Sequence, residues 1–204
     1  MSRRCIGLLG GSFNPAHEGH THISLQALAR LKLDEVWWLV SPQKPLKSNS
    51  ELAAYGKRLE SAKALIHHPR VKVLDIEQRE GLYYSIDTIR FLQKRSRGTQ
   101  FVWVMGADNL EHFHRWRAWR EIFARLPIIV IDRAPYAFAA LHGLAALRYR
   151  HKRTTNAKAL FAHKKAMPSW VYMSIPRHPL SASHLRKTLG AAAFSVHNKA
   201  IQYV

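Results

Sequence analysis

The sequence predicts an α/β protein built on a doubly wound parallel sheet of about six strands, with helices on both faces. Short apolar runs of strand length alternate along the chain with longer segments whose apolar residues recur at helical spacing. Several of the short runs are continuously apolar, which is typical of parallel strands covered on both faces. A glycine-rich turn joins the first run to the first helical segment. Strands joined in this way take right-handed crossovers.

Residues that end a strand or start a helix bound these runs. Pro42 follows the apolar run 36–40, and Pro69 ends the helical segment that precedes the third run. Ser85 is expected to cap a helix, with Thr88 three positions on. The predicted strands are residues 5–9, 34–40, 71–74, 100–105, 126–131 and 170–173. The predicted helices are residues 21–31, 51–66, 85–92 and 138–147.

The length favours one domain. The chain has 204 residues and a mass of 23.4 kDa, which is the size of one domain with a substantial core, so we expect residues 1–204 to form a single domain. Cys5 is alone, so no intramolecular disulfide can form, and we expect a reducing cytoplasmic location. No apolar run approaches the length of a transmembrane helix, so we expect no membrane partner. The sequence leaves open whether copies assemble into a homo-oligomer.

The charge balance is strongly basic. Lys and Arg number 32 against 13 Asp and Glu, a formal net charge of +19. A surplus of this size first indicates a nucleic-acid-binding protein. The basic residues are spread along the chain and no RNA-binding motif is visible, so we expect no specific nucleic-acid partner. A cationic surface also attracts polyanionic nucleotides by electrostatic steering.

One basic segment, residues 148–165, has no clear structural pattern. A solvated helix is the favoured interpretation, and an irregular excursion or a partner surface are the alternatives. Residues 180–204 are expected to form a helical C-terminal part.

The turn at residues 10–20, GGSFNPAHEGH, carries the clearest chemistry. Two adjacent glycines let the backbone approach a bulky ligand, and the N–H groups at the following helix start favour an anion. His17 and His20 lie at the mouth of that helix, where each imidazole can donate a hydrogen to a phosphate oxygen. A purely structural turn, or a zinc site made from His17, His20 and His22, are the alternatives.

A second anion site is predicted near the C-terminus. Ser181 can cap a helix whose first turn exposes backbone N–H groups, and Ser183 and Arg186 add a hydroxyl and a guanidinium. Loops that follow parallel strands place ligands at the carboxyl edge of the sheet. Lys47 follows the second predicted strand, and Gly106 and Asp108 follow the fourth, where a carboxylate can accept hydrogen bonds from ribose.

The turn GGSFNPAHEGH closely resembles the first signature of the nucleotidyltransferase superfamily, in the variant typical of bacterial nicotinate mononucleotide adenylyltransferases. Residues 180–186, LSASHLR, resemble the superfamily's second signature, with Leu180 in place of isoleucine or valine. Residues 84–88, YSIDT, and 106–108, GAD, resemble further segments of the same family. The loop containing Lys47 lacks the histidine that the family's pattern places before the lysine.

The resemblance implies a Rossmann-like strand order and a reaction in NAD biosynthesis: the adenylyl group of ATP passes to nicotinate mononucleotide, giving nicotinate adenine dinucleotide and pyrophosphate. We expect Mg²⁺ to be carried largely by ATP oxygens and water, with no protein metal ligands, because no cluster of carboxylates marks a metal site in the sequence. His17, His20 and Arg186 inherit the catalytic role. The implied ATP-binding residues are Gly10, Gly11, Ser12, Phe13, His17, His20, Gly106, Asp108, Ser181, Ser183 and Arg186. The implied acceptor-binding residues are Lys47, Tyr84, Ser85 and Trp116.

Three alternatives stay open. A relative in the same superfamily, such as a pantetheine-phosphate adenylyltransferase or a cytidylyltransferase, shares both signatures but not the segment from Gly106 to Trp116. A nucleic-acid-binding protein would use the net charge alone. A structural or regulatory protein with an inactive site is the third.

Overall fold

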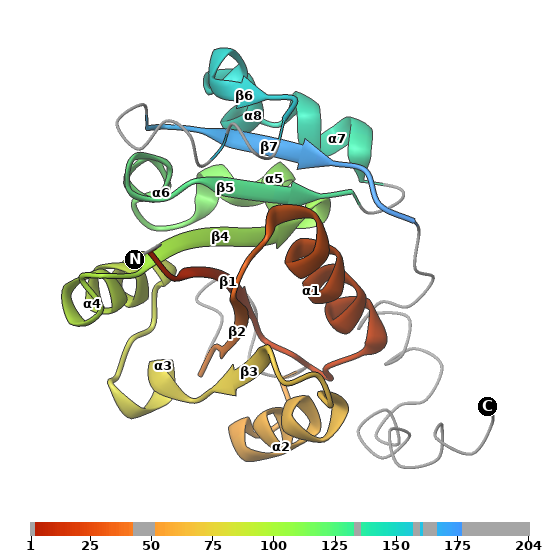
Figure 1. The fold of residues 1–204 in the computed structure, drawn as a ribbon, viewed down its shortest axis with the longest axis vertical. Coiled ribbons are helices and arrows are strands. Elements are labelled where there is room, and N and C mark those ends of the chain that lie inside the picture. The colour runs from red at the N-terminus through yellow and green to blue at the C-terminus, as the bar shows by residue number, and fades with distance from the viewer. Residues whose placement is uncertain (1–2, 43–51, 133–135, 157–159, 161–166, 177–204) are drawn as a thin grey trace.

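The computed structural model describes residues 3–42, 52–132, 136–156, 160 and 167–176. Its centre is a seven-stranded parallel sheet with the order β3-β2-β1-β4-β5-β7-β6 (Figure 1). The strands are β1 (Cys5–Gly11), β2 (Glu35–Val40), β3 (Val71–Leu74), β4 (Gln100–Gly106), β5 (Ile128–Ile131), β6 (Arg153–Thr154) and β7 (Trp170–Met173). The predicted fold class, a parallel α/β sheet of Rossmann-like form, is confirmed.

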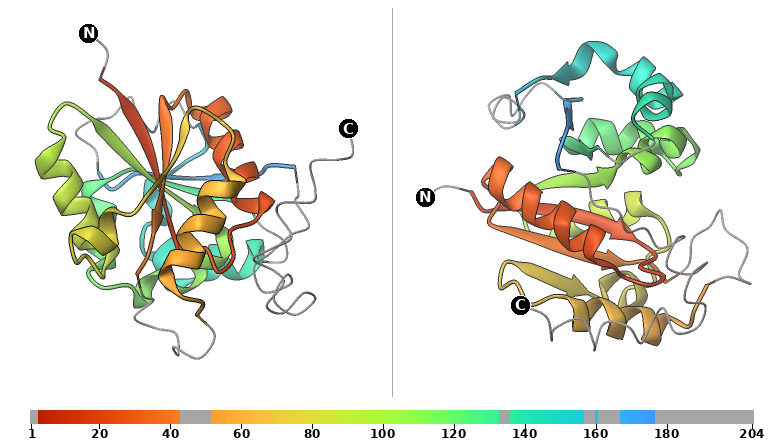
Figure 2. Two further views of the ribbon diagram at one scale, coloured as in Figure 1. Left: turned by 90° about the horizontal axis from the view of Figure 1, so that it is seen from below. Right: turned by 90° about the vertical axis from the view of Figure 1, so that its right-hand side faces the viewer.

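Helices cover both faces of the sheet, as the left view of Figure 2 shows. Side chains of β1 alternate between two cores, since Ile6 and Leu8 pack in one and Leu9 in the other. The helices are α1 (Glu18–Leu31), α2 (Tyr55–Leu65), α3 (Ile76–Arg79), α4 (Ser85–Arg95), α5 (Ala107–His112), α6 (Trp119–Arg125), α7 (Ala137–His142) and α8 (Leu144–Arg148). Two short 3-10 helices are η2 (Phe113–Arg115) and η3 (Arg150–Lys152).

The two cores are built from different helices. Buried residues of α1 and α2, such as Ile23, Leu28 and Ala62, belong to the core that contains Leu9. Buried residues of α4 and α6, such as Ile89 and Phe123, belong to the other. The sheet is therefore buried on both sides, which explains why its strands read as continuous apolar runs.

The edge strand β6 lies where a solvated helix was favoured, and that interpretation is wrong for residues 153–154, whereas residues 150–152 form the exposed 3-10 helix η3. The guanidinium carbon of Arg153 lies 5.6 Å from the ring centre of Trp170 and 5.5 Å from that of Tyr172. Stacking on two rings of β7 holds the segment beside the sheet edge. Charge density alone did not reveal this contact.

Two helix predictions need correction. Tyr84, not Ser85, is the N-cap of α4, and Ser85 is the first helical residue. The single helix predicted for residues 138–147 is two helices that meet at Gly143. A β-carbon on Gly143 would lie 3.2 Å from the carbonyl oxygen of Glu111, so the close approach of α5 favours glycine there.

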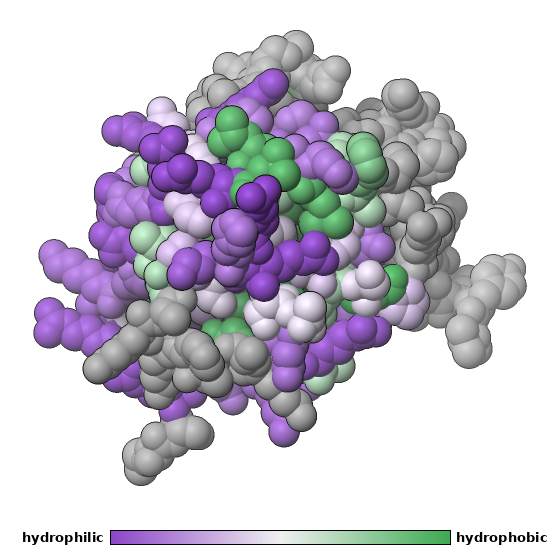
Figure 3. All heavy atoms as spheres, turned by 90° about the horizontal axis from the view of Figure 1, so that it is seen from above, coloured by the Kyte–Doolittle hydropathy of each residue, from purple (hydrophilic) through white to green (hydrophobic). Residues whose placement is uncertain are grey.

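The face formed by α7 and α8 carries exposed apolar side chains. Figure 3 shows apolar atoms gathered among hydrophilic ones on this side of the molecule. Phe138, Leu144 and Leu147 are the exposed large side chains of the two helices. Among the described residues, no helix has the length and apolar character needed to cross a membrane.

Candidate active site

The candidate site lies where the sheet order reverses. From β1 the chain passes outward through β2 and β3, and β4 then pairs with the opposite edge of β1. The turns that follow β1 and β4 diverge at such a point, which leaves room for a ligand at the carboxyl edge of the sheet. Gly10 and Gly11 lie at the end of β1 on this edge, and Gly106 lies at the end of β4.

Gly10 is needed for packing between neighbouring strands. A β-carbon there would lie 2.8 Å from Cη2 of Trp103, a fully buried side chain of β4. Because a buried indole ring cannot yield by this much without disturbing its neighbours, any side chain at position 10 would displace the turn. The first glycine therefore lets β1 and Trp103 approach each other.

Phe13 anchors the turn after β1. Its φ of 46° lies in the left-handed region, which is uncommon for a bulky side chain and needs support from the surrounding structure. The ring is 1% exposed and stacks on Trp38 with centroids 4.9 Å apart. It also lies 4.8 Å from the ring of His20. The aromatic residue of the motif thus serves as a buried anchor for the turn.

His17 and His20 form a pair at the start of α1. Their ring centroids are 3.9 Å apart, and His17, the N-cap residue, is 2% exposed. The backbone N–H of His17 donates to Nδ1 of His20 over 3.2 Å. Because Nδ1 of His20 accepts this bond, the hydrogen of the neutral ring is placed on Nε2, where it can be donated to an anion.

A second layer of contacts fixes the His20 backbone. The Ser24 hydroxyl donates to the His20 carbonyl over 2.9 Å, and the indole N–H of Trp38 donates to the Ser24 hydroxyl over 2.8 Å. Ser24 and Trp38 are both fully buried. These bonds tie the first turn of α1 to β2.

The zinc alternative finds no support in this geometry. Nε2 of His22 lies 2.7 Å from the carbonyl oxygen of Pro176, so this side chain contacts the segment after β7. In the part of the chain that the structure describes, no three His, Cys, Asp or Glu side chains are grouped as metal ligands.

Three of the predicted acceptor residues, Tyr84, Ser85 and Trp116, lie on the α4 and α6 side of the sheet. Trp116 follows η2 in an extended conformation, and its ring meets Trp103 edge-on at 6.0 Å and Phe113 at 5.0 Å. Trp103 thus lies between Trp116 and Gly10 of the glycine turn. Tyr84 packs against the same core as Trp116. The guanidinium carbon of Arg117 lies 4.5 Å from the Tyr84 ring centre.

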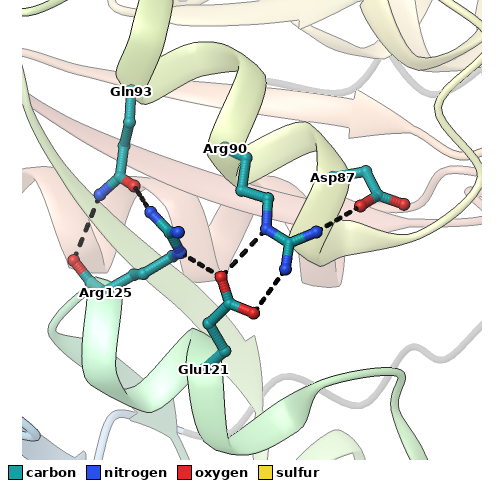
Figure 4. Close-up of polar contacts among 5 residues, drawn as sticks. All are labelled: Asp87, Arg90, Gln93, Glu121 and Arg125. Carbon is teal, nitrogen blue, oxygen red and sulfur yellow. Dashed lines mark hydrogen bonds and ion pairs between the residues drawn. The ribbon is translucent and has the colours of Figure 1, made fainter.

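An ion-pair network holds α4 against α6 (Figure 4). Arg90 donates to both carboxylate oxygens of Glu121 over 3.0 and 2.6 Å, and also to Asp87 over 3.1 Å. Arg125 donates to the same Glu121 carboxylate over 2.6 Å and to Gln93 over 3.1 Å. Hydrogen bonds from Arg90 and Arg125 hold the pKa of Glu121 below its ordinary value.

The remaining predicted residues divide into two groups. Asp108 is half-buried in the first turn of α5, directly after Gly106, and Ser12 lies in the turn after β1. The other group lies outside the described residues, so its assigned roles stay predictions: Lys47, Ser181, Ser183 and Arg186.

Sequence reasoning missed Arg58. Its side chain on α2 is fully buried and donates to the carbonyl oxygens of Ser12, Ser41, Pro42 and Ala53 over 2.6 to 3.0 Å. The available signal was spacing, because Arg58 falls three and four positions before Ser61 and Ala62, which are also buried.

Glu77 on α3 was also missed. It is 4% exposed and accepts a hydrogen bond from the Thr88 hydroxyl over 2.8 Å. Burial raises the pKa of its carboxyl from 4.5 to about 7, although hydrogen bonds from Thr88 and Ser41 act in the opposite direction. No periodic pattern marks a carboxylate inside so short a helix.

A glycine turn, a histidine pair at a helix start and a switch-point location together define a nucleotide-binding α/β protein. Residues 8–188 match the model of the cytidylyltransferase-like family. A solved structure, the Plasmodium falciparum nicotinic acid mononucleotide adenylyltransferase complexed with NaAD, superposes with a TM-score of 0.66 at 16% identity, covering 90% of this chain and 83% of that one. At this identity the likeness concerns the fold alone.

Curated relatives narrow the class. A probable nicotinate-nucleotide adenylyltransferase of Bradyrhizobium sp. (strain ORS 278) is 46% identical over 186 residues, covering 91% of this chain and 97% of the relative. A protein of the same name from Methylorubrum extorquens is 45% identical over 181 residues, covering 89% of this chain and 98% of the relative. The chain belongs to the nicotinate-nucleotide adenylyltransferases of the cytidylyltransferase-like family.

Proposed function

We propose that the chain transfers the adenylyl group of ATP to nicotinate mononucleotide, as the names of its relatives indicate. The oxygen of the mononucleotide phosphate forms a bond to the α-phosphorus of ATP. The bond from that phosphorus to the β-bridging oxygen breaks, and its electron pair leaves with pyrophosphate. The products are nicotinate adenine dinucleotide and pyrophosphate. The observation that carries the proposal is the His17–His20 pair beside the glycine turn.

The attacking phosphate is already an anion, so the site needs no base to activate it. The difficulty is to hold two mutually repelling phosphate groups in line while negative charge builds on the leaving pyrophosphate. His20, with its hydrogen placed on Nε2, is suited to donate to that charge. Gly11 and Ser12 bring backbone close to the phosphates, and we assign Asp108 to the ribose of ATP.

Magnesium enters this proposal as part of the substrate. The described residues contain no group of three carboxylate, imidazole or thiolate ligands, so they offer no protein cage for a cation. Mg²⁺ binds readily through phosphate oxygens and retained water, and it would arrive on ATP. The residues of this chain then need only position the phosphates.

The acceptor end supports an acid in preference to its amide. Trp116 offers a flat face to a pyridine ring. Arg117 adds positive charge over Tyr84, the residue that caps α4. A carboxylate matches this environment. A neutral amide presents donors where the site already has donors, and such a mismatch in a polar site discriminates strongly.

The deciding experiment measures pyrophosphate release with ATP and Mg²⁺ against four conditions: nicotinate mononucleotide, nicotinamide mononucleotide, phosphopantetheine and no acceptor. We expect the highest kcat/KM with the nicotinate compound. Equal values for acid and amide would contradict the carboxylate argument. Activity with phosphopantetheine alone would indicate a pantetheine-phosphate adenylyltransferase instead. No pyrophosphate release with any acceptor would favour the nonenzymatic alternatives.

A further inference from the structure

Five buried or half-buried residues form a hydrogen-bonded series from the glycine turn to the start of α4, here called the polar network: Ser12, Arg58, Ser41, Glu77 and Thr88. They come from the turn after β1, α2, the end of β2, α3 and α4. The two ends of the network belong to the two elements that the proposed function assigns to ATP and to the acceptor.

The first half of the network is centred on Arg58. One guanidinium nitrogen donates to the Ser12 carbonyl over 2.6 Å and to the Ser41 carbonyl over 2.8 Å. The other terminal nitrogen donates to the Pro42 carbonyl over 3.0 Å, and Nε donates to the Ala53 carbonyl over 2.9 Å. The planar guanidinium thus fixes the glycine turn, the end of β2 and the start of α2 in one arrangement.

The second half passes through Glu77. Ser41 hydrogen-bonds to its carboxyl group, and the Thr88 hydroxyl donates to Oε1 over 2.8 Å. Thr88 is fully buried one turn into α4, and its hydroxyl lies 3.4 Å from the carbonyl oxygen of Tyr84. The same carbonyl accepts hydrogen bonds from the backbone N–H groups of Asp87 and Thr88. Glu77 therefore sets where the capped end of α4 lies relative to β2.

We propose that Arg58 and Glu77 are positioning residues for the transfer reaction, because the polar network sets the distance between the glycine turn and the acceptor end of the site. Neither side chain needs to touch a substrate. In the part of the chain that the structure describes, Arg58 has no carboxylate partner, so its donors are committed to backbone carbonyls. Buried polar groups are costly to leave unpaired, which makes this arrangement resistant to small displacements.

The consequence for the reaction follows from its geometry. An in-line displacement requires the attacking oxygen to face the α-phosphorus within a narrow range, and a misplacement of about 1 Å can cost roughly a hundredfold in rate. Loosening the polar network should therefore lower kcat more than it weakens the binding of either substrate. A purely structural role would lower stability and leave the turnover of the folded protein unchanged.

The test uses Thr88→Val, which removes the hydroxyl and preserves shape, with Thr88→Ser as the conservative rescue. Ser61→Ala is the matched control, because it removes another buried hydroxyl bond, to the backbone carbonyl of Arg58, and leaves the bonds of the Arg58 guanidinium and of Glu77 in place. We expect Thr88→Val to lower kcat about tenfold or more while each KM moves about twofold at most. Thr88→Ser should restore kcat, and Ser61→Ala should leave it near wild type.

A second readout does not depend on activity. Backbone hydrogen exchange should rise in Thr88→Val at residues 10–14 and at Ser41 as well as in α4, and it should not rise there in Ser61→Ala. Exchange changes confined to α4, or equal turnover losses in Thr88→Val and Ser61→Ala, would overturn the inference.

The inference rests on the proposed function, but the two can fail separately. A wild-type protein that shows no activity with nicotinate mononucleotide would refute that function. The exchange pattern would still decide whether the polar network couples the glycine turn to α4.

Discussion

Replacing Glu77 with glutamine should make the protein less sensitive to pH. In the folded protein, burial raises the pKa of the Glu77 carboxyl from its ordinary value of 4.5 to about 7. The folded state then binds the proton more tightly than the unfolded state, so unfolding releases a proton between these two values. Stability from this group is fully present below the unfolded pKa and is lost as the pH rises through the folded one.

The size of the effect follows from the two pKa values. A pKa difference from 4.5 to about 7 corresponds to roughly 3 kcal/mol in the free energy of unfolding, most of which falls between about pH 5 and about pH 8. An amide at position 77 does not ionise. Its oxygen can accept the Thr88 hydrogen bond as the protonated acid does, and its NH₂ group can donate to Ser41.

Urea unfolding of wild type and Glu77→Gln, followed by the fluorescence of the six tryptophans, measures this difference. Near pH 5 the two proteins should agree within about 1 kcal/mol, and near pH 8 the variant should be more stable by about 2 to 3 kcal/mol. Glu121→Gln is the control, because that carboxyl is exposed and its pKa is lowered by Arg90 and Arg125. Parallel pH profiles for wild type and Glu77→Gln would show that burial does not hold the Glu77 proton.

Four further substitutions test other parts of the site. His20→Ala should lower kcat about a hundredfold or more with the fold intact, while His22→Ala, on the same helix but bonded to Pro176, should turn over like wild type; equal losses would remove the phosphate-site assignment. Trp116→Ala should raise the KM for the mononucleotide about tenfold and leave that for ATP unchanged, since stacking on one ring contributes about 1 to 3 kcal/mol, and a shift in both constants would point to a general packing role. Gly10→Ala should destabilise the protein by about 1 to 3 kcal/mol in urea unfolding, because its methyl group would meet Trp103, and an unchanged midpoint would contradict that contact. Glu121→Gln should change the melting temperature little despite its short ion pairs, because exposed pairs contribute little, so a large fall would show that the α4–α6 contact depends on them.

The strands and the glycine turn were predictable because their signals are local. A continuous apolar run such as 36–40 indicates a buried parallel strand wherever it lies, and β2 is found there. The turn motif fixes its own geometry within eleven residues, and the rings of His17 and His20 lie 3.9 Å apart at the start of α1. The second signature, with Ser181 and Arg186, lies outside the described residues and stays a prediction.

Non-local contacts explain what the sequence did not reveal. Ser85 with Thr88 three positions on fits a capped helix, yet the Thr88 hydroxyl is committed to Glu77, eleven residues earlier. The Arg58 guanidinium is buried because carbonyls from Ser12, Ser41 and Pro42, remote in sequence, converge on it. β6 is held by Arg153 stacking on rings of β7. Each of these partners belongs to another element, and helical or strand periodicity indicates only which face of its own element a residue lies on.

The two buried ionisable groups of the polar network also bear on why the site suits anions. Arg58 is neutralised by no carboxylate in the described part of the chain, and dipoles of backbone carbonyls satisfy its donors instead. Glu77 lies in the same network, yet burial favours its neutral form below about pH 7. A buried ion pair between these two residues would have cancelled the positive charge beside the glycine turn. Keeping the carboxyl protonated and the guanidinium bonded to carbonyls leaves a net positive interior next to the place where two phosphate groups must be held together.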